Sequence, residues 1–493
     1  MPGVGRPDVL IRSHMNYLAF RGAAARRWAS FAGAWLLCAA ALAGCTVATP
    51  PTEVPLRAPT GWQAAAPAAP DARTEALLQW WSRLDDPVLA ALVEQAQDAS
   101  PTLAQAQARL LQARANLAAA GGARQPSLTG TVNANRSASF TTGMVAANVL
   151  SAGADAGWEL DLFGALRHGV SAAQARAEGA GLAWHDARLS VAADVANTYT
   201  GLRACEQLAA VYGDDATSQE RTATLTAEKV RVGFESPANG SLAEAARAQS
   251  RERAIAQQAQ CDLAVKALVE LTGQDEPALR AQLAPGRARL PQPAAFAVAA
   301  LPAQVLAQRP DVAAASRDLA AAAYDAGVAE AQRYPSVKLA GSVTAGLVRI
   351  GGTNNDVVTW SIGPSVSLPL FDGGRRRAQA EAARAVYDER RGVFDQRLRR
   401  AVREVEEALV TLDAAQRRET DAATAARHYR RYFESTEERW RLGAGSVIDM
   451  EEARRAALTA QATHVGVQRE RVSAWIGLYR AVGGGWRAED PTP

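Results

Sequence analysis

The chain has 493 residues, of which 48% are hydrophobic and 21% are charged, so it is long enough to bury a large core. Its 54 basic residues nearly balance its 51 acidic residues and leave a net charge of +3. Proteins that bind nucleic acid usually concentrate basic charge on one face, so this balance argues against a nucleic-acid partner. Aromatic residues make up 6% of the chain and alanine is abundant, a composition that suits long, closely packed helices.

The N-terminus has the pattern of a bacterial targeting segment. Arginines between residues 21 and 27 precede an apolar stretch from Trp28 to Ala43, which is shorter than the ~20 residues of a membrane helix. The stretch ends in Leu42-Ala43-Gly44-Cys45, which resembles the bacterial lipobox. We therefore predict a signal peptide at 1–44 and a covalent lipid on Cys45, with no other cofactor. An ordinary signal peptide, or an anchor helix that contains a cysteine, is the alternative.

The residues that follow Cys45 indicate where the mature protein resides. Thr46 stands where an aspartate would commonly retain a bacterial lipoprotein at the inner membrane, which favours the outer membrane. Residues 45–72 are rich in proline, alanine and threonine, and we expect them to form an extended, lipid-anchored linker.

The rest of the chain contains one segment of about two hundred residues twice, and self-similarity of this kind indicates a protein built by repetition. Four pairs of positions fix the register, with separations of 208 to 210 residues: Pro101 and Pro310, Pro126 and Pro335, Phe163 and Phe371, and Gly233 and Gly443.

Each copy contains two segments in which apolar and polar residues alternate. The predicted strands are 127–136, 153–163, 336–346 and 357–371. Alternation over about ten residues is typical of transmembrane β-strands, although a half-buried soluble sheet alternates in the same way. Four strands cannot close a barrel, and an open sheet edge is not stable in lipid. The chain must then oligomerise, and two copies would supply eight strands and three copies twelve.

Long helical segments follow each strand pair. We expect helical hairpins at 164–274 and 372–482, each reversing at a glycine turn, Gly233 or Gly443. Helices of this length persist in water only when they pack side by side. The predicted organisation is therefore a signal peptide (1–44), a linker (45–72), repeat one (73–285), an equatorial seam (286–309), repeat two (310–485) and a C-terminal segment (486–493).

Cys205 and Cys261 each lie 28 residues from Gly233. If Gly233 is the apex of the first hairpin, the two cysteines face each other across antiparallel helices, and the oxidising periplasm allows a disulfide. Two buried thiols that behave as small apolar residues are the equal alternative.

These features together resemble the outer-membrane factor family, the TolC-like export channels, and its NodT-type lipoprotein branch. The resemblance covers Trp80 to Gly485 and rests on several motifs in a specific order. They are the lipobox, Trp80-Trp81, the Arg-x-Pro-Ser sequences at Pro126 and Pro335, and the Leu-Phe pairs that end at Phe163 and Phe371.

The resemblance implies an α+β membrane protein with four transmembrane strands and two long helical hairpins per chain. It implies a homotrimer with a twelve-stranded β-barrel above a periplasmic α-helical barrel, closed at its tip until efflux. The implied function is the outer-membrane channel of a tripartite export system for drugs or other toxic compounds. Its implied partners are outer-membrane lipid, a periplasmic adaptor that docks near Gly233, Gly443 and Gly445, and an inner-membrane pump of the resistance-nodulation-division type.

The family also places two inward acidic residues three positions apart after the second glycine turn, and Asp449 and Glu452 occupy those positions here. Residues three apart share a helix face, and six carboxylates around a trimer axis would select cations. The simpler interpretation is a capping box, in which Ser446 caps a helix that has acids in its first turn. Both interpretations can hold together. The first turn has Asn239 in place of Asp449, so we expect the second turn to supply most of the acidity.

No nucleotide-binding loop, nucleophile elbow or metal-ligand spacing occurs in the sequence, so we predict that the protein is not an enzyme and holds no metal. The runner-up function is a structural or adhesive periplasmic lipoprotein with a coiled-coil stalk.

Overall fold

A computed structural model describes residues 47–65, 80–138, 145–293, 295, 298 and 302–486. The predicted signal peptide and Cys45 lie outside these described residues, as does most of the C-terminal segment. The chain divides into two compact units, and the division passes through four helices. Unit 1 comprises 1–52, 117–172 and 322–387, and unit 2 comprises 53–116, 173–321 and 388–493.

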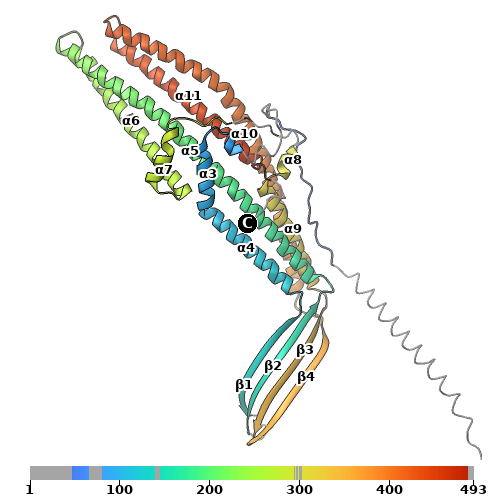
Figure 1. The fold of residues 1–493 in the computed structure, drawn as a ribbon. Helices are drawn as coiled ribbons and strands as arrows, with labels where there is room; N and C mark the ends of the chain where they lie inside the picture. The colour runs from blue at the N-terminus through green and yellow to red at the C-terminus, as the bar shows by residue number, and fades with distance from the viewer. Residues whose placement is uncertain are drawn as a thin grey trace, which may run out of the picture. The chain divides into compact units, whose positions relative to one another are not determined.

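Unit 1 is built around one antiparallel sheet with the order β1-β2-β3-β4 (Figure 1). The strands are β1 (Ser127–Ala138), β2 (Ala146–Leu160), β3 (Ser336–Ile350) and β4 (Thr353–Ser367). The strand pair of each copy is a hairpin, and β2 of the first copy pairs with β3 of the second. Both outer strands, β1 and β4, therefore keep one unpaired edge within a single chain.

Over the part of the sheet nearer the helices, the register brings the apolar residues of all four strands to one face. Leu128 pairs with Ala156, Ala154 with Val343, and Val343 with Trp360. The side chains of this face are largely exposed in the single chain; that of Trp360, for example, is 75% exposed. The opposite face carries Thr129, Thr131, Asn133, Asp155, Glu159, Lys338, Ser342, Thr344, Thr359, Ser361 and Ser365. The alternation read from the sequence therefore divides most of the sheet into an apolar and a polar face, but it reverses near the strand turns, where Val149 and Val348 lie on the polar face and Arg349 on the apolar face.

The strand boundaries differ from the sequence-based predictions. The predicted strand at 153–163 spans 146–160, the one at 357–371 spans 353–367, and the strands predicted to end at 136 and 346 continue to 138 and 350. The far ends of the strand pairs are rich in asparagine, which hides the alternation although the backbone ladder continues. At the near end β2 stops early, because the Asp161 carboxylate accepts hydrogen bonds from Leu166 N and Arg167 N and caps the next helix.

The long helices of the two copies match closely. Helices α5 (Ala165–Arg231) and α10 (Arg375–Arg441) each have 67 residues. Their return partners are α6 (Pro237–Thr272) and α11 (Val447–Ala481), with 36 and 35 residues. Helices α4 (Pro101–Gly122) and α9 (Pro310–Ala331), which precede the strands, both have 22 residues. These equal lengths agree with the duplication inferred from the sequence.

Several short elements were not predicted. They are η1 (Trp80–Arg83), α3 (Pro87–Ala99), α7 (Glu276–Leu283), η3 (Ala284–Gly286) and α8 (Pro302–Ala307), the last of which lies within the predicted seam. In unit 2, α3 and α7 lie beside α5 and α6 (Figure 1). The largest core of this unit joins them to α5, α6 and α11, and in it the buried Trp80 ring stacks on Tyr479 at a centroid distance of 4.8 Å.

Among the described residues, no helix is both long enough and apolar enough to cross a membrane.

Candidate functional site

The candidate site comprises the turns of the two helical hairpins, which we call the first tip (residues 232–239) and the second tip (residues 442–452). At each tip the helix ends in a glycine with positive φ, +81° at Gly233 and +75° at Gly443. The following residue donates its N–H back across the turn, Phe234 to Lys229 O and Ala444 to Arg439 O, both at 2.8 Å. This pattern is a Schellman motif, which reverses the chain over few residues and favours glycine at the left-handed position.

The return helices begin in the same way at both tips. Ser236 Oγ accepts a hydrogen bond from Asn239 N at 3.2 Å, and Ser446 Oγ accepts one from Asp449 N at 3.0 Å. The capping role of Ser446 is therefore present, together with an acidic first turn.

Asp449 and Glu452 are both exposed on α11. Within the described part of the chain, neither carboxylate takes part in an ion pair. The first tip also contains an acid that the sequence analysis overlooked, Glu235, whose carboxylate accepts from the Asn239 side-chain amide at 2.6 Å. The second tip thus presents two unpaired carboxylates, whereas the acid of the first tip is held by its neighbour.

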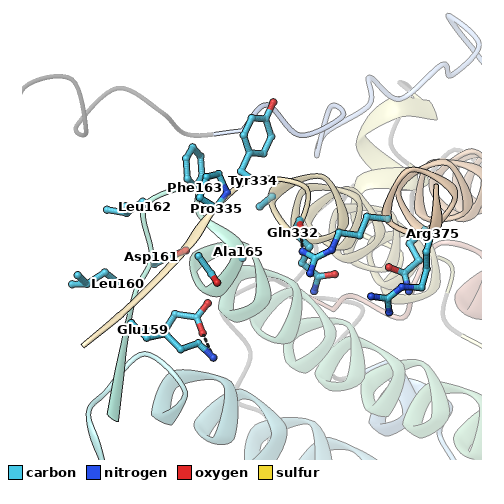
Figure 2. A pocket seen from close by; sticks show the side chains of 15 residues that line it. Glu159, Leu160, Asp161, Leu162, Phe163, Ala165, Gln332, Tyr334, Pro335 and Arg375 are labelled. Carbon is cyan, nitrogen blue, oxygen red and sulfur yellow. Dashed lines mark hydrogen bonds and ion pairs between the residues drawn. The ribbon is translucent and has the colours of Figure 1, made fainter. Parts of the chain in front are cut away.

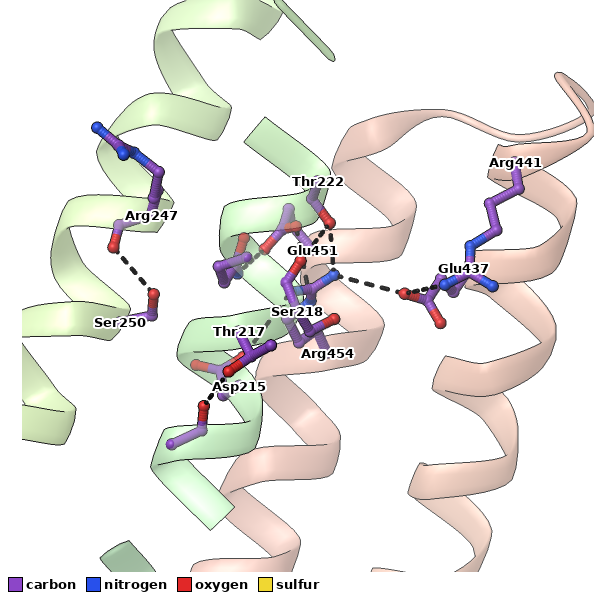
Figure 3. Close-up of polar contacts among 12 residues, drawn as sticks. Asp215, Thr217, Ser218, Thr222, Arg247, Ser250, Glu437, Arg441, Glu451 and Arg454 are labelled. Carbon is purple, nitrogen blue, oxygen red and sulfur yellow. Dashed lines mark hydrogen bonds and ion pairs between the residues drawn. The ribbon is translucent and has the colours of Figure 1, made fainter. Parts of the chain in front are cut away.

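The residues that alternate with these acids on α11 point into the protein. Glu451 and Arg454 are buried, and Figure 3 shows Arg454 between residues of α5 and Glu437 of α10. The Arg454 guanidinium donates to Thr222 Oγ1 at 3.0 Å and lies 3.9 Å from both Asp215 Oδ1 and Glu437 Oε1. Gln219 Nε2 donates to Glu451 Oε2 at 2.6 Å. We call Asp215, Gln219, Thr222, Glu437, Glu451 and Arg454 the polar cluster.

The polar cluster contains three carboxylates around one buried arginine. Desolvation raises the pKa of the Asp215 carboxyl; Arg454 and then Arg253 lower it, and the Glu451 carboxylate raises it further. Several polar atoms of the cluster are buried without a hydrogen-bond partner, among them Asp215 Oδ1, Glu451 Oε1 and Arg454 Nε. Burying such groups raises the free energy of the folded state. The cluster links α5, α10 and α11 through its charges, and protonation of a carboxylate changes those charges.

A second contact joins the last turns of α5 and α10 beside the tips. The Lys229 ammonium lies 4.4 Å from the centroid of the Trp440 ring and donates to Trp440 O at 3.4 Å. Gly445 passes close to the same residue, because a Cβ added there would lie 3.3 Å from Trp440 N. The last turns of α5 and α10 are therefore held together near the tips, and Gly445 is needed for the close approach of the second turn.

Cys205 of α5 and Cys261 of α6 are joined by a disulfide, with their Cα atoms 5.5 Å apart. Cys261 is buried in the main core of unit 2, and Cys205 packs against it. Gln257 Nε2 donates to Cys205 O at 3.3 Å across the same helix pair. The symmetric spacing about Gly233 thus brings the two residues together.

A polar pocket lies where the strands of unit 1 meet its helices (Figure 2). The Phe163 and Tyr334 rings stack at 4.9 Å, and the Lys338 ammonium lies 3.3 Å from the Glu159 carboxylate. Arg375 also lines this pocket. Within the described ranges, no group of three histidine, cysteine or acidic side chains could hold a metal ion.

The first described residues after Cys45 lie against the helices of unit 1. Tyr387 Oη donates to Pro51 O at 3.0 Å. Thr49 lies so close to Gly327 of α9 that a Cβ at Gly327 would meet its methyl group at 2.6 Å and the His168 ring at 3.1 Å. His168 lies near the start of α5 and Gly327 near the end of α9, and these are the helix ends that adjoin the sheet. The start of the linker therefore packs close to the sheet.

Comparison with known proteins identifies the family. The sequence model described as outer membrane efflux protein matches residues 92–274 and 301–484. The chain belongs to this family. It is 27% identical to the pyoverdine export outer membrane protein OpmQ of Pseudomonas aeruginosa, over 92% of this chain and 97% of that protein. Nodulation protein T of Rhizobium leguminosarum bv. viciae is 29% identical over 92% of each chain. The outer-membrane channel OprN aligns with a TM-score of 0.76 and 28% identity, over 88% of this chain and all of that one.

Family membership confirms the predicted fold class and function. This chain is the outer-membrane channel component of an efflux system. In a trimer its membrane strands complete a β-barrel, and its helical hairpins complete a helical barrel. The family is one of transport proteins, and the structural or adhesive lipoprotein considered as an alternative is not supported.

We predict that replacing both Cys205 and Cys261 with serine destabilises unit 2. The bond closes a loop with a sequence separation of 56 residues, and constraining an unfolded loop of that size contributes up to about 4 kcal/mol. Thermal unfolding with and without reductant measures this: the midpoint of the natural protein should fall on reduction, whereas that of the double variant should not respond. The unreduced protein can also be treated with an alkylating reagent. An intact mass that shows both cysteines alkylated would contradict the bond.

We predict a pH-dependent contribution from Asp215. Because its pKa is raised in the folded state, folding takes up a proton, and this contribution to stability is lost as pH rises from about 4 through the raised pKa. Asp215→Asn should lose that dependence. The thermal midpoint of the variant, relative to that of the natural protein, should therefore rise as pH increases. The exposed neighbour variant Asp214→Asn is the matched control. Parallel midpoint curves for all three proteins would show that Asp215 is not involved.

Proposed function

We propose that this protein is the gated, passive conduit of a tripartite export complex. In this proposal it takes small toxic organic compounds from an inner-membrane pump of the resistance-nodulation-division type. A periplasmic adaptor docks at the two tips, and Asp449 and Glu452 form the selective constriction. The observation that carries the proposal is the pair of unpaired, exposed carboxylates on a helix in which the adjacent Glu451 and Arg454 are buried.

The conduit itself follows from the two faces of the sheet. An apolar face suits lipid, and a polar face lined by hydroxyl, amide and charged side chains suits a water-filled lumen. The free edges of β1 and β4 would pair with those of neighbouring copies and close the barrel.

The separation of charges on α11 supports a constriction at the second tip. Glu451 and Arg454 face α5 and form an ion pair at 3.7 Å within the polar cluster, while Asp449 and Glu452 remain exposed. In a trimer the exposed pair supplies six carboxylates, and acidic rings of this kind favour cations. The charge balance of the polar cluster would hold α11 against α5 in the closed state, and the adaptor would loosen that contact.

Exposed apolar side chains at both tips support adaptor docking. Phe234, next to Gly233, is 84% exposed, and Leu442, next to Gly443, is 75% exposed. Val232 and Ile448 extend these apolar patches. Exposed apolar side chains clustered at helix turns are typical of protein interaction sites. Relatives named as solvent and toluene efflux pump outer membrane proteins favour small organic cargo for this chain too.

We include lipidation of Cys45 in the proposal. The packing of Thr49 against Gly327 and His168 keeps the start of the linker near the sheet, within reach of the membrane surface. A second attachment to the membrane would then add to that of the barrel.

The constriction is tested with the purified trimer in planar lipid bilayers. We expect channel conductance with a preference for cations, and a severalfold lower cation-to-anion permeability ratio when Asp449→Ala and Glu452→Ala are combined, because the ring loses its charge. The control is Glu244→Ala with Glu252→Ala, which removes the same charge from α6. Absence of conductance would refute the conduit, whereas conductance with unchanged selectivity would refute only the acidic ring.

Docking is tested by combining Phe234→Glu with Leu442→Glu. Each change removes an apolar contact of about 1.5–3 kcal/mol, so adaptor binding should weaken at least tenfold and export-dependent resistance should fall. The control is Val410→Glu on α10, which places the same charge on a side chain that is 58% exposed and outside both tips. Full resistance in the tip variant, with trimers still formed, would rule out docking through these residues.

A further inference from the structure

Each face of the sheet carries three charged residues, but both arginines lie on the same face. Asp155, Glu159 and Lys338 lie on the polar face, and Lys338 pairs with Glu159. The two arginines, Arg136 of β1 and Arg349 of β3, lie on the apolar face instead. An arginine on the lipid face of a membrane barrel is strongly destabilising at the bilayer midplane but nearly neutral close to the interface. Two arginines on this face therefore need a location at the membrane boundary.

The register places both arginines in one row across the sheet. Arg136 pairs with Asn148, Asn148 with Arg349, and Arg349 with Asn354. The row is close to the strand turns, at the end of the sheet opposite the helices. It does not follow from the duplication, because the residue of copy two that corresponds to Arg136 by the 209-residue offset is Ala345. The two arginines come from non-equivalent positions and reach the same row only through the pairing of β2 with β3.

The apolar surface between this row and the helices has the height of a membrane. The rows from Leu150 to Leu160, which carry one charged residue, Asp356 in the outermost of them, span ten residues of β2, which is about 34 Å along the strand. At the ~40° tilt of membrane strands this is about 26 Å across the bilayer, close to the ~25 Å apolar band of outer-membrane barrels. Aromatic residues mark the lower boundary, with Trp158 in the strand and Phe163 and Tyr334 below it. The arginine row therefore lies at the outer boundary.

These two arginines have no ion-pair partner in the described part of the protein. Both side chains are exposed, and neither makes an ion pair with a described residue. The sequence between β1 and β2 contains no acid, and the one acid of the apolar face, Asp356 of β4, lies one row further in, diagonally across from Arg349. Adjacent strands are ~4.8 Å apart, so the Cα atoms of Arg136 and Arg349 are separated by about 10 Å, with the Asn148 amide between them.

We propose that Arg136 and Arg349, with Asn148 between them, bind the phosphate groups of a diphosphorylated glycolipid headgroup in the outer leaflet. Each guanidinium forms two parallel hydrogen bonds to a phosphate, and the spacing allows the pair to contact two phosphates of one headgroup. The acyl chains of the same lipid then lie on the apolar rows below. Three copies place six such arginines around the rim of the barrel, which fixes its depth in the membrane.

The proposal is tested with the purified trimer in neutral detergent micelles, using fluorescent diphosphoryl lipid A as the probe. We expect the natural protein to bind this lipid at least tenfold more tightly than its dephosphorylated form. Combining Arg136→Gln with Arg349→Gln should remove that preference, whereas Lys338→Gln, on the opposite face, should retain it. Equal binding of both lipids by the natural protein, or an unchanged preference in the glutamine variant, would overturn the proposal.

Two further measurements keep the result interpretable. If the glutamine variant does not form heat-modifiable trimers, Arg136→Lys with Arg349→Lys retains the charge but not the paired hydrogen bonds. That variant should show an intermediate preference, and an unchanged preference would again count against the site. Full displacement of the lipid by millimolar inorganic phosphate would identify a simple anion site and so refute recognition of a lipid headgroup.

Discussion

The unpaired backbone groups along the edges of β1 and β4 determine that this protein must assemble from several copies. Within one chain β1 and β4 each keep an unpaired edge, and hydrocarbon offers no donor or acceptor to satisfy it. Pairing these edges between copies is what makes oligomerisation necessary, because the four strands of one chain can neither close alone nor remain open in lipid. The polar lumen, the arrangement of six tips around an axis and the proposed acidic ring all follow from that requirement.

Most of the architecture could be read from the sequence because its signals are local. Alternation with a period of two identified all four strands, and the glycines matched between the two copies, Gly233 and Gly443, located both tips. Strand lengths were harder, since a backbone ladder continues through residues such as Asn148 and Asn354 whatever their polarity. The short helices α3 and α7 were missed because their burial depends on contact with distant helices and not on any pattern of their own.

The site was predicted in part for a related reason. Asp449 and Glu452 were identified through the position that follows Gly443, but the sequence alone does not separate them from the neighbouring Glu451 and Arg454. Spacing alone shows that two residues share a face and does not show which face is buried. Only the packing of α11 against α5, through Thr222 and Asp215, separates the exposed acids from the buried ones.

The disulfide gives the two hairpins different mechanical properties. It fastens α5 to α6 at a point 28 residues from the turn at Gly233, which leaves a free arm of about 42 Å. The second hairpin contains no cysteine and is joined along its length by contacts such as the ion pair of Arg418 with Glu470. A force that separates the helices from the turn downward can therefore open α5 from α6 only as far as the disulfide, whereas no covalent bond limits the separation of α10 from α11. The first hairpin is thus the harder of the two to open over its full length.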